Sequence, residues 1–203
     1  MIYKIAFAGP PASGKSTTLE LLKHFKHAEN VHVIYLNEIA TAFMDWPEYV
    51  AAHDNTPIRQ YYIMKAQILL EDLAMQEAAF FDKDIVLILC DRAVLDVFVY
   101  LDKDEAANIV DAADAENYGK RYDYVLYFEP TGEAQFLSRN NSSRIETSYN
   151  EVKKVSERTL SAWREHFNRD MIFIPPADTV EAKTNNTARK INELLKTEIW
   201  KVN

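Results

Sequence analysis

A glycine-bearing loop directly after an apolar N-terminal run constrains this chain more than any other feature. Gly9-Pro-Pro-Ala-Ser-Gly14-Lys15-Ser16 follows the apolar residues 2–8 and matches the pattern G-x-x-x-x-G-K-[ST]. The chain has only 4 glycines, and at that composition the pattern is expected by chance about 0.0005 times. It therefore predicts a strand, a tight loop and a helix, with the backbone N–H groups of the loop turned inward around phosphate oxygens.

The residue types in this loop suit a nucleotide bound with magnesium. A helix starting near Lys15 directs the positive end of its dipole toward an anion. Lys15 adds a point charge between the outer phosphates, and the Ser16 hydroxyl is a candidate ligand for Mg²⁺. A purely structural turn is the alternative, but the strand–loop–helix context favours the nucleotide. The predicted nucleotide-binding residues are Gly9, Pro11, Ala12, Ser13, Gly14, Lys15, Ser16 and Thr17.

Composition narrows the class of protein. The 203 residues predict a single domain, residues 1–203, and the longest apolar run, Ile85 to Cys90, is far shorter than the roughly 18 residues of a membrane helix. Cys90 is the only cysteine, so an intramolecular disulfide is excluded and a reducing, cytoplasmic location is expected. The formal charge of −8 disfavours a broad electrostatic grip on nucleic acid, although a local basic patch stays open. The oligomeric state is not indicated.

Apolar runs alternate with stripes at helical spacing along the chain. We expect strands at 2–8, 31–36, 85–89, 124–128 and 171–174, and helices at 15–27, 58–81, 94–101, 103–115, 152–167 and 179–200. The segments 45–57 and 131–148 lack periodicity and predict irregular connections. This alternation predicts an α/β fold, with a five-stranded parallel sheet and helices on both faces. Ligands of such sheets bind beyond the carboxyl ends of the strands.

Several motifs, in order along the chain, resemble the NadR-type AAA kinase/ATPase family. They are GPPASGKST at 9–17, Glu38 after the second strand, CDRAVLDVFVYL at 90–101, RNNSSRIE at 139–146 and the SAW around Trp163. That family includes nicotinamide-riboside kinase domains, a eukaryotic TRPL-translocation-defect branch and phage kinases acting on hydroxymethyluracil in DNA. The resemblance implies a P-loop NTPase fold like that of nucleoside and nucleotide kinases, with ATP and Mg²⁺ as cofactors. Ala40-Thr41 stand where the family often has an arginine, so one substrate contact is expected to differ.

Carboxylates at two predicted strand ends are the main candidates for catalysis. Asp91 and Arg92 end the third strand, where an aspartate can hold Mg²⁺ or accept a substrate proton and an arginine can clamp a phosphate or an acceptor group; a surface ion pair is the alternative. Glu38 ends the second strand, and its resemblance to a glutamate of deoxynucleoside kinases implies a general base, against the alternative of stabilising a helix dipole. We favour Glu38 as the base and Asp91 as the metal ligand, and the choice stays open. Asp96 and Tyr100 either line the acceptor pocket or have capping and packing roles.

The polar segment 131–148 is expected to form a lid. Its Arg139 and Arg144 are candidates for stabilising the charge that spreads over the transferred phosphoryl oxygens, with ordinary surface arginines as the alternative. Arg144 is favoured, because Arg144-Ile-Glu146 matches the family pattern. The resemblance also implies that Asp178, after the fifth strand, lies where related kinases hold adenine.

These features predict a kinase that transfers the γ-phosphoryl group of ATP to a hydroxyl of a nucleoside, nucleotide or related small molecule. One alternative keeps this chemistry but takes a hydroxymethylated base within DNA as the acceptor. A second is a nucleotide-binding switch or ATPase without a small-molecule acceptor. The local basic track for DNA consists of Arg139, Arg144, Lys153, Lys154, Lys120 and Arg121. The chain has no Asn-Lys-x-Asp sequence for guanine, which counts against a GTP-dependent switch. The preference for ATP as the donor rests on the resemblance alone. No membrane partner is expected.

Overall fold

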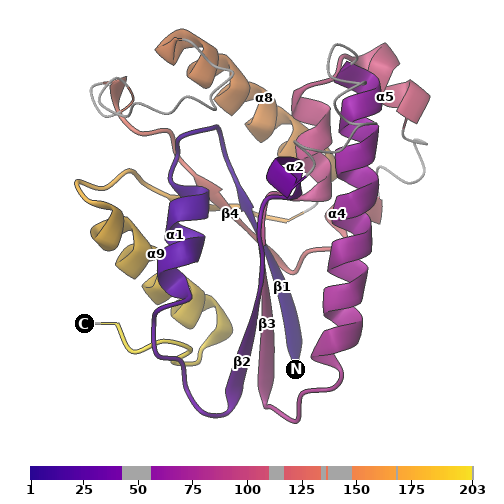
Figure 1. Cartoon of the computed structure of the whole chain (residues 1–203). Coiled ribbons are helices and arrows are strands. Elements are labelled where there is room, and N and C mark those ends of the chain that lie inside the picture. The colour runs from indigo at the N-terminus through magenta and orange to yellow at the C-terminus, as the bar shows by residue number, and fades with distance from the viewer. Residues whose placement is uncertain (43–55, 110–116, 134–135, 137–147, 168, 203) are drawn as a thin grey trace.

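Five parallel strands form the centre of the molecule (Figure 1). The computed structural model describes the chain except residues 43–55, 110–116, 134–135, 137–147, 168 and 203. The strands are β1 (Ile2–Ala8), β2 (Val31–Leu36), β3 (Ile85–Asp91), β4 (Tyr124–Phe128) and β5 (Ile172–Ile174). They lie in the order β2-β3-β1-β4-β5, and every pairing is parallel. The predicted α/β class is therefore confirmed.

Helices cover both faces of this sheet. They are α1 (Lys15–Leu22), α2 (Ile39–Ala42), α4 (Thr56–Ala78), the 3-10 helix η1 (Val94–Val99), α5 (Lys103–Ile109), α8 (Tyr149–His166) and α9 (Val180–Leu195). Figure 1 shows α1 and α9 together on one face and α4, η1 and α8 on the other. None of the helices in the described ranges is long and apolar enough to span a bilayer.

Two apolar clusters, one on each face, hold the layers together. Successive side chains of a strand point to opposite faces, so neighbouring residues of β1 enter different clusters. Phe7 packs in the cluster that contains Leu19 of α1 and Ile191 of α9, whereas Ala6 belongs to the cluster that contains Trp163 of α8. β3 is buried along its whole length. The strand ends that carry polar residues are therefore attached to a closely packed apolar core.

The first helix is shorter than its sequence predicts. The prediction of a helix to residue 27 is wrong, because α1 ends at Leu22. The N–H groups of His24 and Phe25 then bond to carbonyl oxygens three residues earlier, and His27 forms an antiparallel bridge with Trp200. This contact with the C-terminal segment takes the chain away from the helix axis.

The last helix also ends before its predicted boundary at residue 200. Lys196 adopts a left-handed conformation (φ 49°, ψ 37°) that terminates α9 at Leu195. The side-chain oxygen of Asn192 then accepts the N–H of Ile199 at 2.9 Å. The apolar residues after the helix pack as an irregular segment rather than as a helical stripe.

Candidate active site

The loop between β1 and α1 has a backbone conformation that its glycines permit. Gly9 (φ 134°) and Gly14 (φ 93°) have positive φ values, which residues with a Cβ rarely adopt. A Cβ atom on Gly9 would collide with the carbonyl oxygen of Phe128, so the loop passes close to β4. Gly14 is the N-cap of α1, and the first N–H groups of a helix have no partner within it. This is the geometry of an anion site at a helix N-terminus.

Lys15 folds back over this loop. Its Nζ donates to the carbonyl oxygens of Gly9 (2.8 Å) and Pro10 (2.9 Å) and to Oγ of Ser13 (3.4 Å). Burial lowers the pKa of Lys15, and the negative charge of Asp91 opposes that shift. The ammonium group is thus held at the mouth of the loop, where phosphate oxygens are able to replace its carbonyl partners.

Asp91 lies beside this loop at the end of β3. Its partner in the parallel register is Phe7 of β1, two residues before the loop begins. Burial raises the pKa of Asp91, and this shift is opposed by the charge of Lys15 and by a hydrogen bond from the Ser16 hydroxyl. A hydroxyl and a carboxylate in contact are the hard oxygen ligands that Mg²⁺ prefers. Ser16 and Asp91 therefore fit a magnesium ion at the loop.

Glu38 and Arg92 form an ion pair between the ends of β2 and β3. Nη1 of Arg92 donates to Oε1 of Glu38 at 3.0 Å, and the guanidinium also lies 5.2 Å from the ring centroid of Tyr100. Arg92 has a φ of 87°, a conformation that costs on the order of 1–3 kcal/mol for a residue with a long side chain. The structure thus brings Lys15, Glu38, Asp91 and Arg92 to one edge of the sheet.

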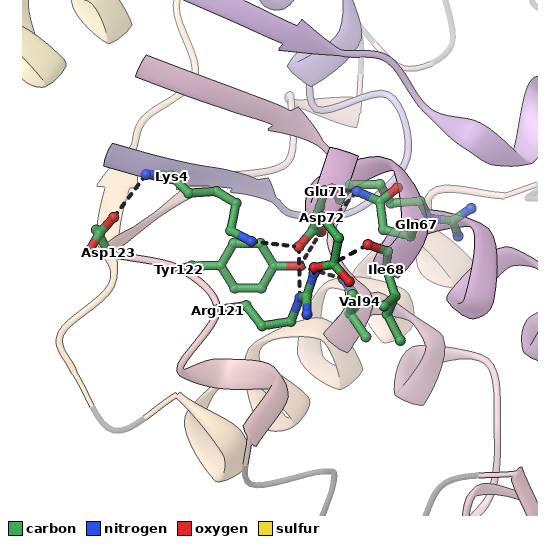
Figure 2. Close-up of polar contacts among 10 residues, drawn as sticks. Lys4, Gln67, Ile68, Glu71, Asp72, Val94, Arg121, Tyr122 and Asp123 are labelled. Atoms are coloured by element: carbon green, nitrogen blue, oxygen red, sulfur yellow. Dashed lines mark hydrogen bonds and ion pairs between the residues drawn. The ribbon is translucent and has the colours of Figure 1, made fainter. Parts of the chain in front are cut away.

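A buried ionic cluster lies behind this edge (Figure 2). Glu71 of α4 has no exposed side chain and accepts hydrogen bonds from Lys4 (3.1 Å), Arg121 (3.0 Å) and Tyr122 (2.6 Å). Arg121 also bonds to Asp72 at 2.6 Å. Arg121, one of the residues considered for a local basic track, is therefore paired with two carboxylates of α4, and its side chain is 20% exposed. We call these residues the Glu71 cluster.

The Glu71 cluster supports the strained turn after β3. Gln67, one helical turn before Glu71, donates to its carboxylate at 3.0 Å and to the carbonyl oxygen of Arg92 at 3.3 Å. The hydroxyl of Tyr122 accepts the N–H of Val94 at 2.8 Å. Figure 2 shows these contacts reaching from α4 toward the turn. Both bonds lie on the C-terminal side of Arg92, at its own carbonyl group and at Val94, and they hold the turn in which its φ is positive.

Asp96 is buried at the start of η1. It accepts the N–H of Ala93 at 3.3 Å and Nε1 of Trp163 at 2.9 Å. The sequence left open whether Asp96 lines the acceptor pocket or has a capping and packing role. The hydrogen bonds of Asp96 in the structure are those of capping and packing. Burial raises the pKa of Asp96, and the charge of Arg92 opposes that shift.

Lys183 is a candidate that sequence reasoning missed. It lies on α9 with 4% of its surface exposed, and its Nζ donates to the carbonyl oxygens of Ser13 (2.8 Å) and Glu129 (3.3 Å). It therefore ties the phosphate loop to the end of β4. Little in the sequence indicates this role of Lys183, because a lysine near Thr184 and Thr187 in a polar helix is typical of a solvent-exposed face.

Of the remaining predicted site residues, the structure describes some and not others. Pro11 and Thr17 lie in the phosphate loop and at the start of α1. Asp178 is exposed in the turn before α9. Arg139 and Arg144, with most of the expected lid, lie outside the described residues.

Comparison with known proteins agrees with this fold. A family model described as an AAA domain matches residues 4–183. A structure of deoxyadenosine kinase from M. mycoides with the products dCMP and a flexible dCDP has a TM-score of 0.55 at 16% identity, covering 94% of this chain and 99% of that one. A second structure of that enzyme, with dATP, has a TM-score of 0.54 at 14% identity, covering 93% and 99%. No curated protein matches the sequence.

Proposed function

The chain belongs to the AAA-domain family, and from that premise we propose that it is an ATP-dependent phosphotransferase acting on a hydroxyl of a nucleoside, nucleotide or related small molecule. The observation that carries this proposal is the convergence of Lys15, Glu38 and Asp91 at the carboxyl ends of three neighbouring strands. The fold's likeness to deoxyadenosine kinases solved with deoxynucleotides supports it.

On the donor side, the phosphate loop and Lys15 bind the outer phosphates of ATP. N–H groups of the loop donate to phosphate oxygens, and Lys15 exchanges its carbonyl partners for them. Ser16 and Asp91 are the residues that hold Mg²⁺, which when bound supplies positive charge against the phosphates. Asp178 belongs to the adenine side of this proposal.

On the acceptor side, Glu38 is the general base and Arg92 orients it. The carboxylate of Glu38 takes the proton of the substrate hydroxyl while the hydroxyl oxygen bonds to the γ-phosphorus. At the same time the bond between that phosphorus and the leaving oxygen of ADP breaks. The ion pair with Arg92 engages one oxygen of Glu38, and we assign the other to the substrate. Asp91 is the alternative base, but its bond with Ser16 favours the metal.

The segment 131–148 acts as a lid in this proposal, within one kinase domain of residues 1–203. Arg139 and Arg144 are assigned to the charge that develops on the transferred group, because arginines stabilise it over its equatorial oxygens. Closure of a polar segment also excludes water, which competes with the substrate hydroxyl as an acceptor.

The test is the transfer of a labelled γ-phosphate from ATP, with Mg²⁺, to two separate pools of acceptors. One pool contains nucleosides, nucleotides and nicotinamide riboside, and the other contains DNA with normal and hydroxymethylated bases. We expect label in the first pool, reduced at least about 100-fold by Lys15→Ala and unchanged by Lys190→Ala, a matched lysine exposed on α9. Label in DNA alone, or phosphate release that no acceptor stimulates, contradicts the proposal and favours the DNA kinase or the switch.

Two substitutions separate the proposed roles of the carboxylates. Asp91→Asn should raise the Mg²⁺ concentration needed for half-maximal transfer, because a metal ligand loses its charge. Glu38→Gln should lower kcat by roughly 100-fold or more at every Mg²⁺ concentration, because the base is lost. Measuring transfer against Mg²⁺ for both variants checks the assignment, and exchanged profiles would make Asp91 the base.

A further inference from the structure

Gln67 of α4 is a buried amide whose two ends are unequally satisfied. It is 2% exposed, and its Nε2 donates to Oε1 of Glu71 at 3.0 Å and to the carbonyl oxygen of Arg92 at 3.3 Å. Among the described residues, no group donates to its Oε1. A buried carbonyl oxygen without a donor lowers stability, and an apolar side chain of similar length would avoid that loss. Stability alone therefore does not account for a glutamine at this position.

Glu71 does not depend on this amide. The hydroxyl of Tyr122 also donates to Oε1 of Glu71, at 2.6 Å, and the other carboxylate oxygen accepts from two cations. Both oxygens of Glu71 thus keep a donor when Gln67 is replaced. Figure 2 shows Gln67 next to Glu71 on α4. What the amide adds to the molecule is its contact with the carbonyl oxygen of Arg92.

The carbonyl group of Arg92 and its side chain turn together. The angle φ is the rotation about the bond between N and Cα, and the residue before Arg92 is fixed in β3, where Asp91 pairs with Phe7. A change from the present φ of 87° therefore swings both the carbonyl carbon and Cβ about that bond. In the present conformation the side chain reaches Glu38, with Nη1 3.0 Å from Oε1. A bond that holds the carbonyl oxygen therefore also restrains the direction of the guanidinium.

We propose that Gln67 is a positioning residue for phosphoryl transfer, which holds the carbonyl oxygen of Arg92 so that the guanidinium stays on Glu38. This inference rests on the proposed function, in which Glu38 takes the proton of the acceptor hydroxyl and Arg92 orients it. The phosphate loop is held by other contacts, those of Lys15 and Lys183. Gln67 therefore acts on the acceptor side of the site and not on ATP.

The transfer kinetics of the whole chain test this role. Gln67→Met removes the amide at nearly constant length and should lower kcat about tenfold, because a small displacement of a reacting group is costly. The KM for Mg-ATP should stay unchanged. Gln76→Met makes the same change at an exposed position of α4 and should alter neither constant. A Gln67→Met protein with the kcat of the wild type, or with a KM for Mg-ATP that rises as far as kcat falls, overturns the proposal.

A double-mutant cycle shows whether Gln67 acts through Arg92. Arg92→Ala removes the guanidinium, so Gln67→Met should lower kcat no further in that background. A structural role that does not pass through Arg92 instead makes the two reductions multiply, and that result overturns the proposal. Circular dichroism checks that each variant is folded. If Gln67→Met unfolds, Gln67→Asn, whose amide is one methylene group closer to α4, replaces it in these experiments.

A crystal structure of Gln67→Met tests the contact without any activity. We expect the φ of Arg92 to change and its Nη1 to leave hydrogen-bond distance of Glu38, while the bond between Tyr122 and the N–H of Val94 stays. An unchanged ion pair between Arg92 and Glu38 overturns the proposal. A wild type that transfers phosphate to no acceptor contradicts the proposed function instead, and the two structures still decide whether Gln67 holds Arg92.

Discussion

Two lysines from distant parts of the chain hold the phosphate loop. Lys15 bonds to carbonyl oxygens on the inner side of the loop, and Lys183, 170 residues from Ser13, holds the Ser13 carbonyl from α9. The carbonyl of Ser13 and the N–H of Gly14 belong to one planar peptide. Fixing that oxygen toward Lys183 therefore turns the Gly14 N–H the opposite way, so Lys183 is a positioning residue for the anion site.

Lys183→Met should weaken the binding of Mg-ATP roughly tenfold and destabilise the fold by about 1–3 kcal/mol, because two buried carbonyl oxygens lose their donor. Calorimetric titration with Mg-ATP measures the first effect and thermal unfolding the second. Lys190→Met, on the same helix but exposed, should change neither, and Lys183→Arg should restore part of the affinity. An unchanged affinity in a destabilised Lys183→Met protein would limit Lys183 to a structural role.

At the scale of elements, α4 supports the candidate site from behind. Its inner side carries Glu71 and Gln67, which connect the helix to β1 and to the turn that holds Arg92. A buried ionic cluster of this kind is strongly destabilised when one partner is removed, because charges are left in the interior. The position of the candidate site therefore depends on a side chain that the proposed mechanism does not use.

Glu71→Gln keeps the shape of the side chain but removes the charge that faces Lys4 in the interior and leaves Arg121 with Asp72 alone. We expect a loss of about 3–5 kcal/mol in the free energy of unfolding, measured by chemical denaturation. Glu193→Gln breaks an exposed ion pair with Lys190 and should cost less than about 1 kcal/mol. Similar losses for the two variants would show that the Glu71 cluster does not stabilise the fold as an ion pair.

Local patterns predicted the strands and the phosphate loop, because apolar runs and glycine spacing act over a few residues. The Glu71 cluster was not predictable, since Glu71 reads as an ordinary glutamate of a helix and its charged partners Lys4 and Arg121 lie 50 or more residues away. The end of α1 was missed for a related reason, because it depends on the contact between His27 and Trp200. Sequence patterns thus locate the site, while distant contacts fix its geometry.

At the scale of the whole molecule, the buried charged groups of the site lower the stability of the fold. Burial raises the pKa of Asp91 and of Asp96 and lowers that of Lys15, so each charged form is less favourable in the folded protein than in the unfolded chain. The two apolar clusters on either side of the sheet offset this loss. Functional sites commonly oppose stability in this way.

Asp91→Asn should therefore raise the melting temperature at neutral pH, although Asp91 belongs to the proposed active site. Because the pKa of Asp91 is higher in the folded than in the unfolded state, the folded protein binds more protons between the two values, and stability falls as pH rises through that interval. The variant lacks this term, so its advantage should be largest near pH 8 and should shrink toward about pH 4, where the carboxyl of the unfolded chain also takes up its proton. Thermal unfolding across this range measures the difference, with the exposed Asp170→Asn as the control. A variant that is less stable than the wild type at pH 8 would mean that the attraction between the charges of Asp91 and Lys15, together with the hydrogen bond from Ser16, outweighs the burial of Asp91.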